Sequence, residues 1–294
     1  MKRGIIYSDL VNTVSDTYSR EIMTPQYGEG LSELLKEVRT KVFGVLNGLD
    51  YTDFDPSADK YIKAPFSWRT LDQRAANKAD LQKSFHLTVD PRVPLLAYCG
   101  RLDDQKGLDL LVDTLPTVLE EYNVQFVVIG TGQQKYREFF AKLETQFPKQ
   151  VGTHLMGDFI LPRRVFAGCD MLLLPSKFEP GGIVVIEGMR YGAVPIVRST
   201  GGLADIVIDF DPESNSGNGF SFDNYNRLSF FGAIVRAIQV YRNNRLWTEL
   251  IRRAMREDVS WEKAARQYLD LYARAVEFRR DRQNPVSEIG KRIE

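Results

Sequence analysis

The chain has 294 residues, and its 39 lysines and arginines balance 39 aspartates and glutamates, so the formal net charge is zero. This balance argues against a nucleic-acid partner, because holding phosphates requires an excess of positive charge. No apolar run approaches the roughly 18 residues of a membrane span, and Ser8 and Asp9 interrupt any signal peptide. The two cysteines, Cys99 and Cys169, are too few for a disulfide framework or a metal-ligand cluster. We therefore expect a cytoplasmic protein without a membrane or nucleic-acid partner.

The first 45 residues carry little predicted structure. Their pattern indicates a strand over Leu10–Ser15 and a helix over Asp16–Thr24, with glycines at 28 and 30 ending it. A segment of this length rarely builds a core by itself. We expect a domain boundary near Phe43–Asn47, which makes residues 1–45 a part of another domain.

Downstream of this boundary, strand-like and helix-like segments alternate. The predicted strands are Leu95–Cys99, Val124–Ile129, Val151–Met156, Met171–Leu174 and Val194–Val197. The predicted helices are Gly107–Tyr122, Gln134–Phe147, Pro162–Gly168, Ile183–Tyr191, Leu228–Arg242, Arg245–Arg256 and Trp261–Arg279. Strands that are apolar throughout are typical of a parallel sheet covered on both faces. The pattern predicts an α/β domain over residues 46–275, followed by a charged, mobile tail over residues 276–294.

In such sheets, ligands bind beyond the carboxyl ends of the strands, so the loops that lead into helices are the candidate sites. The loop after Leu95–Cys99 carries two cations, Arg101 and Lys106. The helix dipole disfavours a cation at a helix N-terminus unless an anion lies between the two side chains. The spacing alone favours the interpretation that both are solvated loop charges, and the alternative is that they hold an anion.

A second junction precedes the helix that begins at Ile183. Gly181 and Gly182 leave backbone N–H groups open to an anion at this helix N-terminus. Glu179 and Glu187 lie eight positions apart, which is about 12 Å along a helix. That exceeds the roughly 5–9.5 Å between the paired carboxylates of glycosidases. The two glutamates could instead contact different parts of one long ligand, or they could be helix charges that face solvent.

A third junction contains Thr200, Gly201 and Gly202. Paired glycines let amides approach a phosphate closely, although they also occur in plain turns. The sequence 130–132 (Gly-Thr-Gly) begins like a dinucleotide fingerprint but lacks its third glycine, and there is no Walker A sequence. We expect no nicotinamide cofactor.

Taken together, these loops resemble the nucleotide-sugar domain of bacterial glycogen synthases and plant starch synthases (glycosyltransferase family 5). The resemblance covers about residues 2–275. The motifs that carry it are Glu179–Gly192, Pro195–Asp205, Arg101–Leu110, Val45–Asp50, Val11–Ile22 and Val259–Ala265.

The resemblance implies a GT-B fold, in which two Rossmann-like domains face each other across a cleft. It also implies a retaining glucosyltransferase that moves glucose from ADP- or UDP-glucose to the non-reducing end of an α-1,4-glucan. Arg101 and Lys106 would hold the donor diphosphate, Glu179 would face the glucose hydroxyls, and Glu187 would face the ribose. Neither a metal nor a cofactor would be needed. The other donor-binding residues would be Gly181, Gly182, Ile183, Thr200, Gly201 and Gly202.

Two departures from the family pattern concern the donor. Gly181 stands where relatives often carry cysteine, and the segment after Gly157 lacks the tyrosine that stacks on the base in some relatives. These departures leave the nucleotide open, whereas the resemblance itself favours ADP-glucose over UDP-glucose as donor. The acceptor that it implies is an α-glucan. A plastid location is expected if the source is a plant or alga.

The family's acceptor-side domain, with its Lys-x-Gly-Gly-Leu loop, is represented only by its last strand and helix. We expect these 294 residues to supply the donor-binding half. Unless a separate polypeptide supplies the N-terminal half, they should transfer glucose weakly or not at all.

Two other interpretations stay open. One is another retaining GT-B transferase, such as a sucrose- or trehalose-phosphate-type synthase, against which Trp261 and the segment Asn47–Asp50 argue. The other is a non-catalytic nucleotide- or glucan-binding module. The presence of all four charged residues of the loops argues against it, namely Arg101, Lys106, Glu179 and Glu187.

Overall fold

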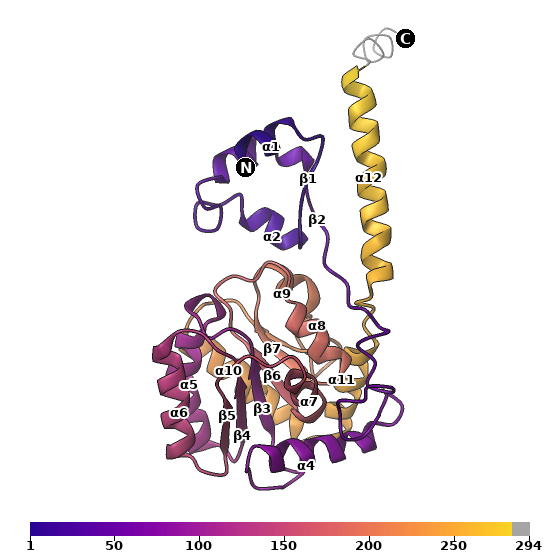
Figure 1. The fold of residues 1–294 in the computed structure, drawn as a ribbon. Coiled ribbons are helices and arrows are strands. Elements are labelled where there is room, and N and C mark those ends of the chain that lie inside the picture. The colour runs from indigo at the N-terminus through magenta and orange to yellow at the C-terminus, as the bar shows by residue number, and fades with distance from the viewer. Residues whose placement is uncertain (284–294) are drawn as a thin grey trace.

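The structure of the chain is a computed structural model that describes residues 1–283 (Figure 1). Its main body is a six-stranded sheet in the order β5-β4-β3-β6-β7-β8, and all neighbouring strands are parallel. Every residue of β3, β4 and β6 is buried, because helices cover both faces of the sheet. This confirms the predicted α/β class. The strands are β3 Leu95–Cys99, β4 Gln125–Ile129, β5 Val151–His154, β6 Met171–Leu174, β7 Val194–Arg198 and β8 Phe220–Phe222.

For each helix around this sheet that was predicted, the first and last residues lie within two positions of the prediction. Two helices and one strand of this main body were not predicted. In α4 the buried side chains include Arg74, Asn77, Lys78 and Gln82, so the sequence has no clear apolar stripe. The helix α9 begins with two glycines, which are poor helix formers, and β8 has only three residues. The helices are α4 Arg74–Ser84, α5 Leu108–Glu121, α6 Gln134–Gln146, α7 Leu161–Gly168, α8 Ile183–Arg190, α9 Gly201–Ile206, α10 Arg227–Tyr241 and α11 Asn244–Arg256.

The order of the strands reverses between β3 and β6. From β3 the chain proceeds through β4 to β5 in one direction, whereas from β6 it proceeds through β7 to β8 in the other. The loops that follow β3 and β6 therefore leave the same edge of the sheet side by side. In open α/β sheets, this switch point is where ligands bind.

The first 45 residues form a small unit that lies over α9 (Figure 1). Its contact with the main body includes polar groups: the carboxylate of Asp205, in α9, accepts hydrogen bonds from the Ser15 hydroxyl at 2.8 Å and the Thr17 amide at 3.0 Å. It also includes an aromatic contact, with the Tyr27 and Phe178 ring centroids 6.3 Å apart. The division of the chain at residue 45 stays a prediction. The elements of the unit are α1 Lys2–Tyr7, β1 Val11–Thr13, α2 Asp16–Glu21, α3 Ser32–Glu37 and β2 Val42–Gly44, with β1 parallel to β2.

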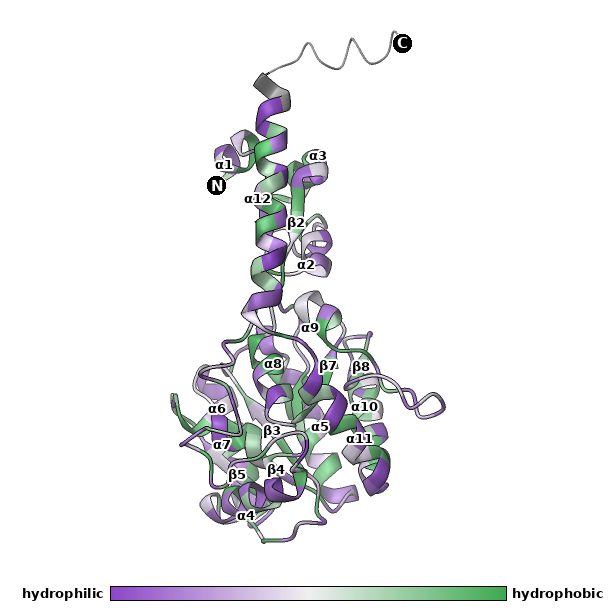
Figure 2. Ribbon diagram, turned by 90° about the vertical axis from the view of Figure 1, so that its right-hand side faces the viewer, coloured by the Kyte–Doolittle hydropathy of each residue, from purple (hydrophilic) through white to green (hydrophobic). Residues whose placement is uncertain are grey.

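The helix α12 (Trp261–Gln283) leaves the main body and passes this N-terminal unit (Figures 1 and 2). The Arg274 guanidinium lies 5.6 Å from the centre of the Phe43 ring, and Arg279 forms an ion pair with Asp9 at 3.7 Å. Figure 2 shows hydrophilic and hydrophobic residues interspersed along this helix. The predicted tail begins inside α12, since residues 276–283 continue the helix; residues 284–294 lie outside the described part of the chain.

Within residues 1–283, no helix combines the length and the apolar character needed to cross a bilayer. In the same range, no three His, Cys, Asp or Glu side chains are grouped so that they could hold a metal ion. Cys99 and Cys169 are free and buried, and burial raises the pKa of the Cys169 thiol to about 12.

Candidate functional site

The candidate site lies where the loops after β3 and β6 meet. Gly107, which has a left-handed φ of 72°, begins α5 at the end of the first loop. A Cβ at this position would stand 1.9 Å from the carbonyl oxygen of Pro175 in the second loop, so only glycine permits this approach. The amide of Lys177 also donates a hydrogen bond of 2.8 Å to the Gln105 carbonyl. The two loops therefore pack directly against each other.

The contact between these loops brings a predicted cation and a predicted carboxylate together. The Lys106 Nζ lies 2.5 Å from the Glu179 Oε2, and their side chains are 16% and 10% exposed. The Ser176 hydroxyl donates a second hydrogen bond, of 3.1 Å, to the same oxygen. The anion beside Lys106 is thus the carboxylate of Glu179.

Arg101 lies at the rim of the same site but points along its own loop. Its guanidinium contacts Asp103 at 2.7 Å and the Gln105 Oε1 at 2.7 Å, and 65% of its side chain is exposed. The Gln105 Nε2 in turn donates a hydrogen bond of 3.3 Å to the Phe178 carbonyl, next to Glu179. Gln105 thereby connects Arg101 to the loop that carries Glu179.

The glycines after β7 pack against the Glu179 loop from the other side. The Gly202 amide donates a hydrogen bond of 2.8 Å to the Glu179 carbonyl, and a Cβ on Gly201 would lie 2.0 Å from that oxygen. The carboxylate of Glu21, from α2, accepts hydrogen bonds from the Gly201 amide at 3.0 Å and the Thr200 hydroxyl at 2.9 Å. Both glycine amides are therefore already bonded, and the predicted contact of these residues with donor phosphates stays a prediction.

The N-terminus of α8 supplies further polar groups to the same edge of the sheet. Gly182 precedes this helix, and Ile183, which begins it, is 46% exposed. The first N–H groups of a helix have no acceptor within it, and the helix dipole favours an anion there. A Cβ on Gly181 would meet Val14 at 3.5 Å, an ordinary contact, so this position has room for a Cβ.

Glu187 lies one turn into α8 and is half-buried. Burial raises the pKa of its carboxyl to about 7; the nearby Arg163 charge lowers it and the Asp53 charge raises it. Among the described residues, this carboxyl has no hydrogen-bond partner. Near neutral pH it can therefore both donate to and accept from a ligand hydroxyl.

The loop between β5 and α7 leaves the same edge of the sheet. It exposes Phe159 almost completely, at 98%, and Ile160 at 47%. Asp158 holds the loop, because its carboxylate accepts hydrogen bonds of 2.8 Å from the amides of Ile160 and Leu161. The loop offers an aromatic ring in the segment where the sequence lacks tyrosine.

Four contributors to the site were not predicted. Ser176 and Gln105 belong to loops that were predicted as candidate sites, but nothing in the spacing of these two residues indicates their contacts. Asp103 accepts a hydrogen bond of 3.1 Å from the Lys106 amide, and its spacing of three from Lys106 is a capping signal that could have found it. Glu21 belongs to the N-terminal unit, and no local signal connects it to Gly201.

Two family descriptions match the chain: "Glycosyl transferases group 1" over residues 81–253 and "Starch synthase catalytic domain" over residues 1–37. A glycogen synthase from Thermosipho melanesiensis is 43% identical over 280 residues, and one from Clostridium beijerinckii is 44% identical over 272 residues. These alignments cover 95% and 92% of this chain but only 58% and 57% of the relatives. The chain thus spans little more than half the length of these relatives.

Solved structures of glycosyltransferases also resemble this chain. The catalytic domain of Starch Synthase IV from Arabidopsis thaliana, bound to ADP and acarbose, superimposes with a TM-score of 0.88 at 36% identity. The match covers 94% of this chain and 57% of that one. A sucrose-phosphate synthase from Thermosynechococcus elongatus superimposes with a TM-score of 0.63 at 21% identity, and the match covers 94% of this chain and 60% of that one. At this identity the similarity shows a common fold and nothing more. These neighbours confirm the predicted GT-B type of fold.

Proposed function

Since this chain belongs to the glycosyl transferases of group 1, we propose that it supplies the donor-binding part of a retaining glucosyltransferase of the glycogen and starch synthase type. The donor is ADP-glucose, and the acceptor is the non-reducing end of an α-1,4-glucan. The glycogen synthase relatives support the reaction, and the ADP in the starch synthase structure supports adenine as the base.

The observation that carries the proposal is the contact of Lys106 with Glu179 across two loops at the switch point of the sheet. Breaking the bond between glucose and phosphate places negative charge on the departing diphosphate and positive charge on the sugar. A cation and a carboxylate side by side can stabilise both. In enzymes, each fixed donor to a developing oxyanion contributes about 2.7–4 kcal/mol.

Donor binding rearranges this contact. The diphosphate oxygens take the ammonium of Lys106 and attract the exposed guanidinium of Arg101 away from Asp103. Glu179 is then free to accept hydrogen bonds from glucose hydroxyls, while the N–H groups of Gly182 and Ile183 face the phosphates. Glu187 exchanges a hydrogen bond with a ribose hydroxyl.

Retention follows if the acceptor hydroxyl attacks on the face from which the diphosphate leaves. The bond between the glucose C1 and the phosphate oxygen breaks as the bond from C1 to the acceptor oxygen forms. The proton of the acceptor hydroxyl passes to the departing phosphate oxygen, which gives ADP and a glucan longer by one glucose. Glu179 stabilises the positive charge on the sugar during this step.

Calorimetric titration of the purified chain tests the proposal. We expect saturable binding of ADP and ADP-glucose, weaker binding of UDP, and at least a tenfold loss of ADP affinity in Lys106→Ala, because about 1.4 kcal/mol corresponds to a factor of ten. The matched control is Lys142→Ala, an exposed lysine on α6, which should bind like the unaltered chain. Unchanged ADP binding by Lys106→Ala would refute the phosphate role of this residue. A preference for UDP would refute the choice of base.

A further inference from the structure

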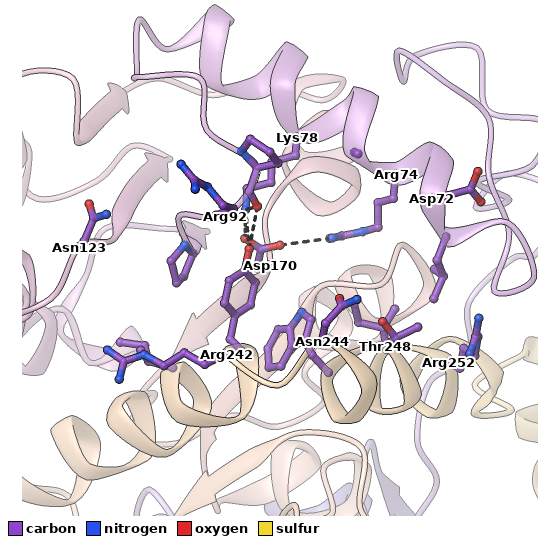
Figure 3. A pocket seen from close by; sticks show the side chains of 18 of the residues that line it. Asp72, Arg74, Lys78, Arg92, Asn123, Asp170, Arg242, Asn244, Thr248 and Arg252 are labelled. Atoms are coloured by element: carbon purple, nitrogen blue, oxygen red, sulfur yellow. Dashed lines mark hydrogen bonds and ion pairs between the residues drawn. The ribbon is translucent and has the colours of Figure 1, made fainter.

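Figure 3 shows a cavity of about 850 Å³. It lies at the edge of the sheet where β3 and β6 begin, opposite the candidate donor site. It is bounded by α4 on one side and by the corner between α10 and α11 on the other. Pro94 and Asp170, which immediately precede β3 and β6, line it. The donor loops follow the same two strands at their other ends, and a strand of five residues spans about 16 Å. The cavity is therefore separate from the donor site.

The lining of this cavity is strongly basic, although the whole chain has no net charge. Six cations line it against two carboxylates, those of Asp72 and Asp170. Asp170 is already satisfied, because it accepts from the Lys78 ammonium at 2.6 Å and the Leu95 amide at 2.8 Å. The six cations are Arg69, Arg74, Lys78, Arg92, Arg242 and Arg252.

Three of these arginines, Arg69, Arg242 and Arg252, form no ion pair with any residue of the described chain. Arg69 comes from the segment before α4, whereas Arg242 and Arg252 come from the corner between α10 and α11, and all three line the cavity. Figure 3 shows Arg242 and Arg252 toward opposite ends of the wall that this corner forms. A concave surface lined by one sign of charge concentrates counter-ions. Guanidinium groups favour phosphate, because their planar donors match two of its oxygens.

The cavity also offers uncharged hydrogen-bonding groups. Asn123, Asn244 and Thr248 line its walls. Trp247, which is 4% exposed, also lines it, and the indole N–H of this residue has no acceptor in the described structure. A buried donor without a partner is costly, so a ligand oxygen or a water molecule at this wall would be favourable. The volume matches the roughly 300–1,000 Å³ of sites for small molecules.

We propose that this cavity is a second ligand site, which takes a phosphorylated small molecule. The rim arginines bind its phosphate, and Asn123, Asn244, Thr248 and the indole of Trp247 contact its polar body. Lys78 and Arg74 form the floor with Asp170 and stay in their ion pairs. The site is independent of the proposed glucosyltransferase activity, since no group of the donor loops lines it.

Inorganic pyrophosphate is the probe, and it is titrated calorimetrically into the Lys106→Ala variant, in which binding at the donor loops is weakened. We expect saturable binding with a dissociation constant below about 1 mM at low salt, weakened as added salt screens the rim charges. In the same background, Arg242→Ala with Arg252→Ala should lower the affinity at least tenfold. The matched control removes two exposed arginines outside the cavity, Arg137 and Arg245, and should bind as before.

A second variant, Thr248→Glu, keeps the test valid if the double arginine variant does not fold. It places a carboxylate on the cavity wall without removing a cation. It should also lower pyrophosphate affinity at least tenfold, with an unchanged unfolding midpoint. The proposal is overturned if pyrophosphate gives no saturable signal up to about 10 mM. It is equally overturned if the control and cavity variants bind alike, which would mean attraction to surface charge alone. Either result leaves the ADP titration, and hence the proposed function, unaffected.

Discussion

Replacing Lys106 with methionine would leave the buried Glu179 carboxylate without its cation. Removing one partner of a buried ion pair costs about 3–5 kcal/mol, because the other charge stays desolvated. Here the Ser176 hydroxyl still donates to the carboxylate, and the two side chains keep 10–16% exposure. We therefore expect Lys106→Met to lower the free energy of unfolding by about 2–4 kcal/mol. Glu179→Gln leaves the ammonium of Lys106 without its carboxylate, but this side chain is longer and more flexible. This variant should therefore lower the free energy of unfolding by about 1–3 kcal/mol.

The double variant, Lys106→Met with Glu179→Gln, leaves no charge stranded. It should therefore cost clearly less than the two single variants together, with an interaction free energy of about 1.5–3 kcal/mol. Urea unfolding of all four proteins, extrapolated linearly to water, measures this quantity. The matched control is Lys36 with Glu33, an exposed pair at 2.8 Å whose side chains are 47% and 77% exposed, which should give no more than about 0.5 kcal/mol. An equal interaction free energy for both pairs would refute the argument that burial makes the site's contact strong.

Other perturbations test the remaining parts of the site. Burial raises the pKa of Glu187 to about 7 in the folded chain, so this carboxyl binds its proton more tightly folded than unfolded. Its contribution to stability should therefore be complete below about pH 4.5 and decline as the pH rises toward 7. Glu187→Gln should remove this decline and raise the free energy of unfolding at pH 8 by roughly 1–3 kcal/mol, measured as urea unfolding against pH; a variant with the same pH profile as the unaltered chain would contradict this. Gly107→Ala must place a Cβ 1.9 Å from the Pro175 carbonyl and should cost at least about 2 kcal/mol and weaken ADP binding. Gly157→Ala, which meets nothing within 4 Å, should be neutral within about 0.5 kcal/mol, so equal midpoints for the two variants would show that the loops do not depend on this approach. Gln105→Ala should weaken ADP binding about fivefold by calorimetry while costing no more than about 1 kcal/mol of stability, and a loss of stability alone would show that this residue does not position the site.

The sequence by itself was sufficient for the fold class and for most of the charged residues of the candidate site. Apolar runs as short as Leu95–Cys99, alternating with longer helical patterns, favour strands that are buried on both faces, and such strands imply a parallel sheet between helices. Once that sheet is accepted, each loop that leads into a helix must lie at its carboxyl edge. Arg101, Lys106 and Glu179 could thus be selected from their place in the alternation, before any contact between them was known.

The contacts themselves were decided only by the tertiary structure. Lys106 and Glu179 lie 73 positions apart, and they meet because the strand order reverses between β3 and β6, which no local pattern encodes. Glu21 reaches Gly201 because a separate unit packs on α9. The basic cavity combines side chains from α4, the strand starts and the α10–α11 corner, and α4 itself escaped prediction because it buries polar side chains such as Lys78. Local periodicity reports which face of an element is apolar, but long-range packing determines which loops and charges become neighbours.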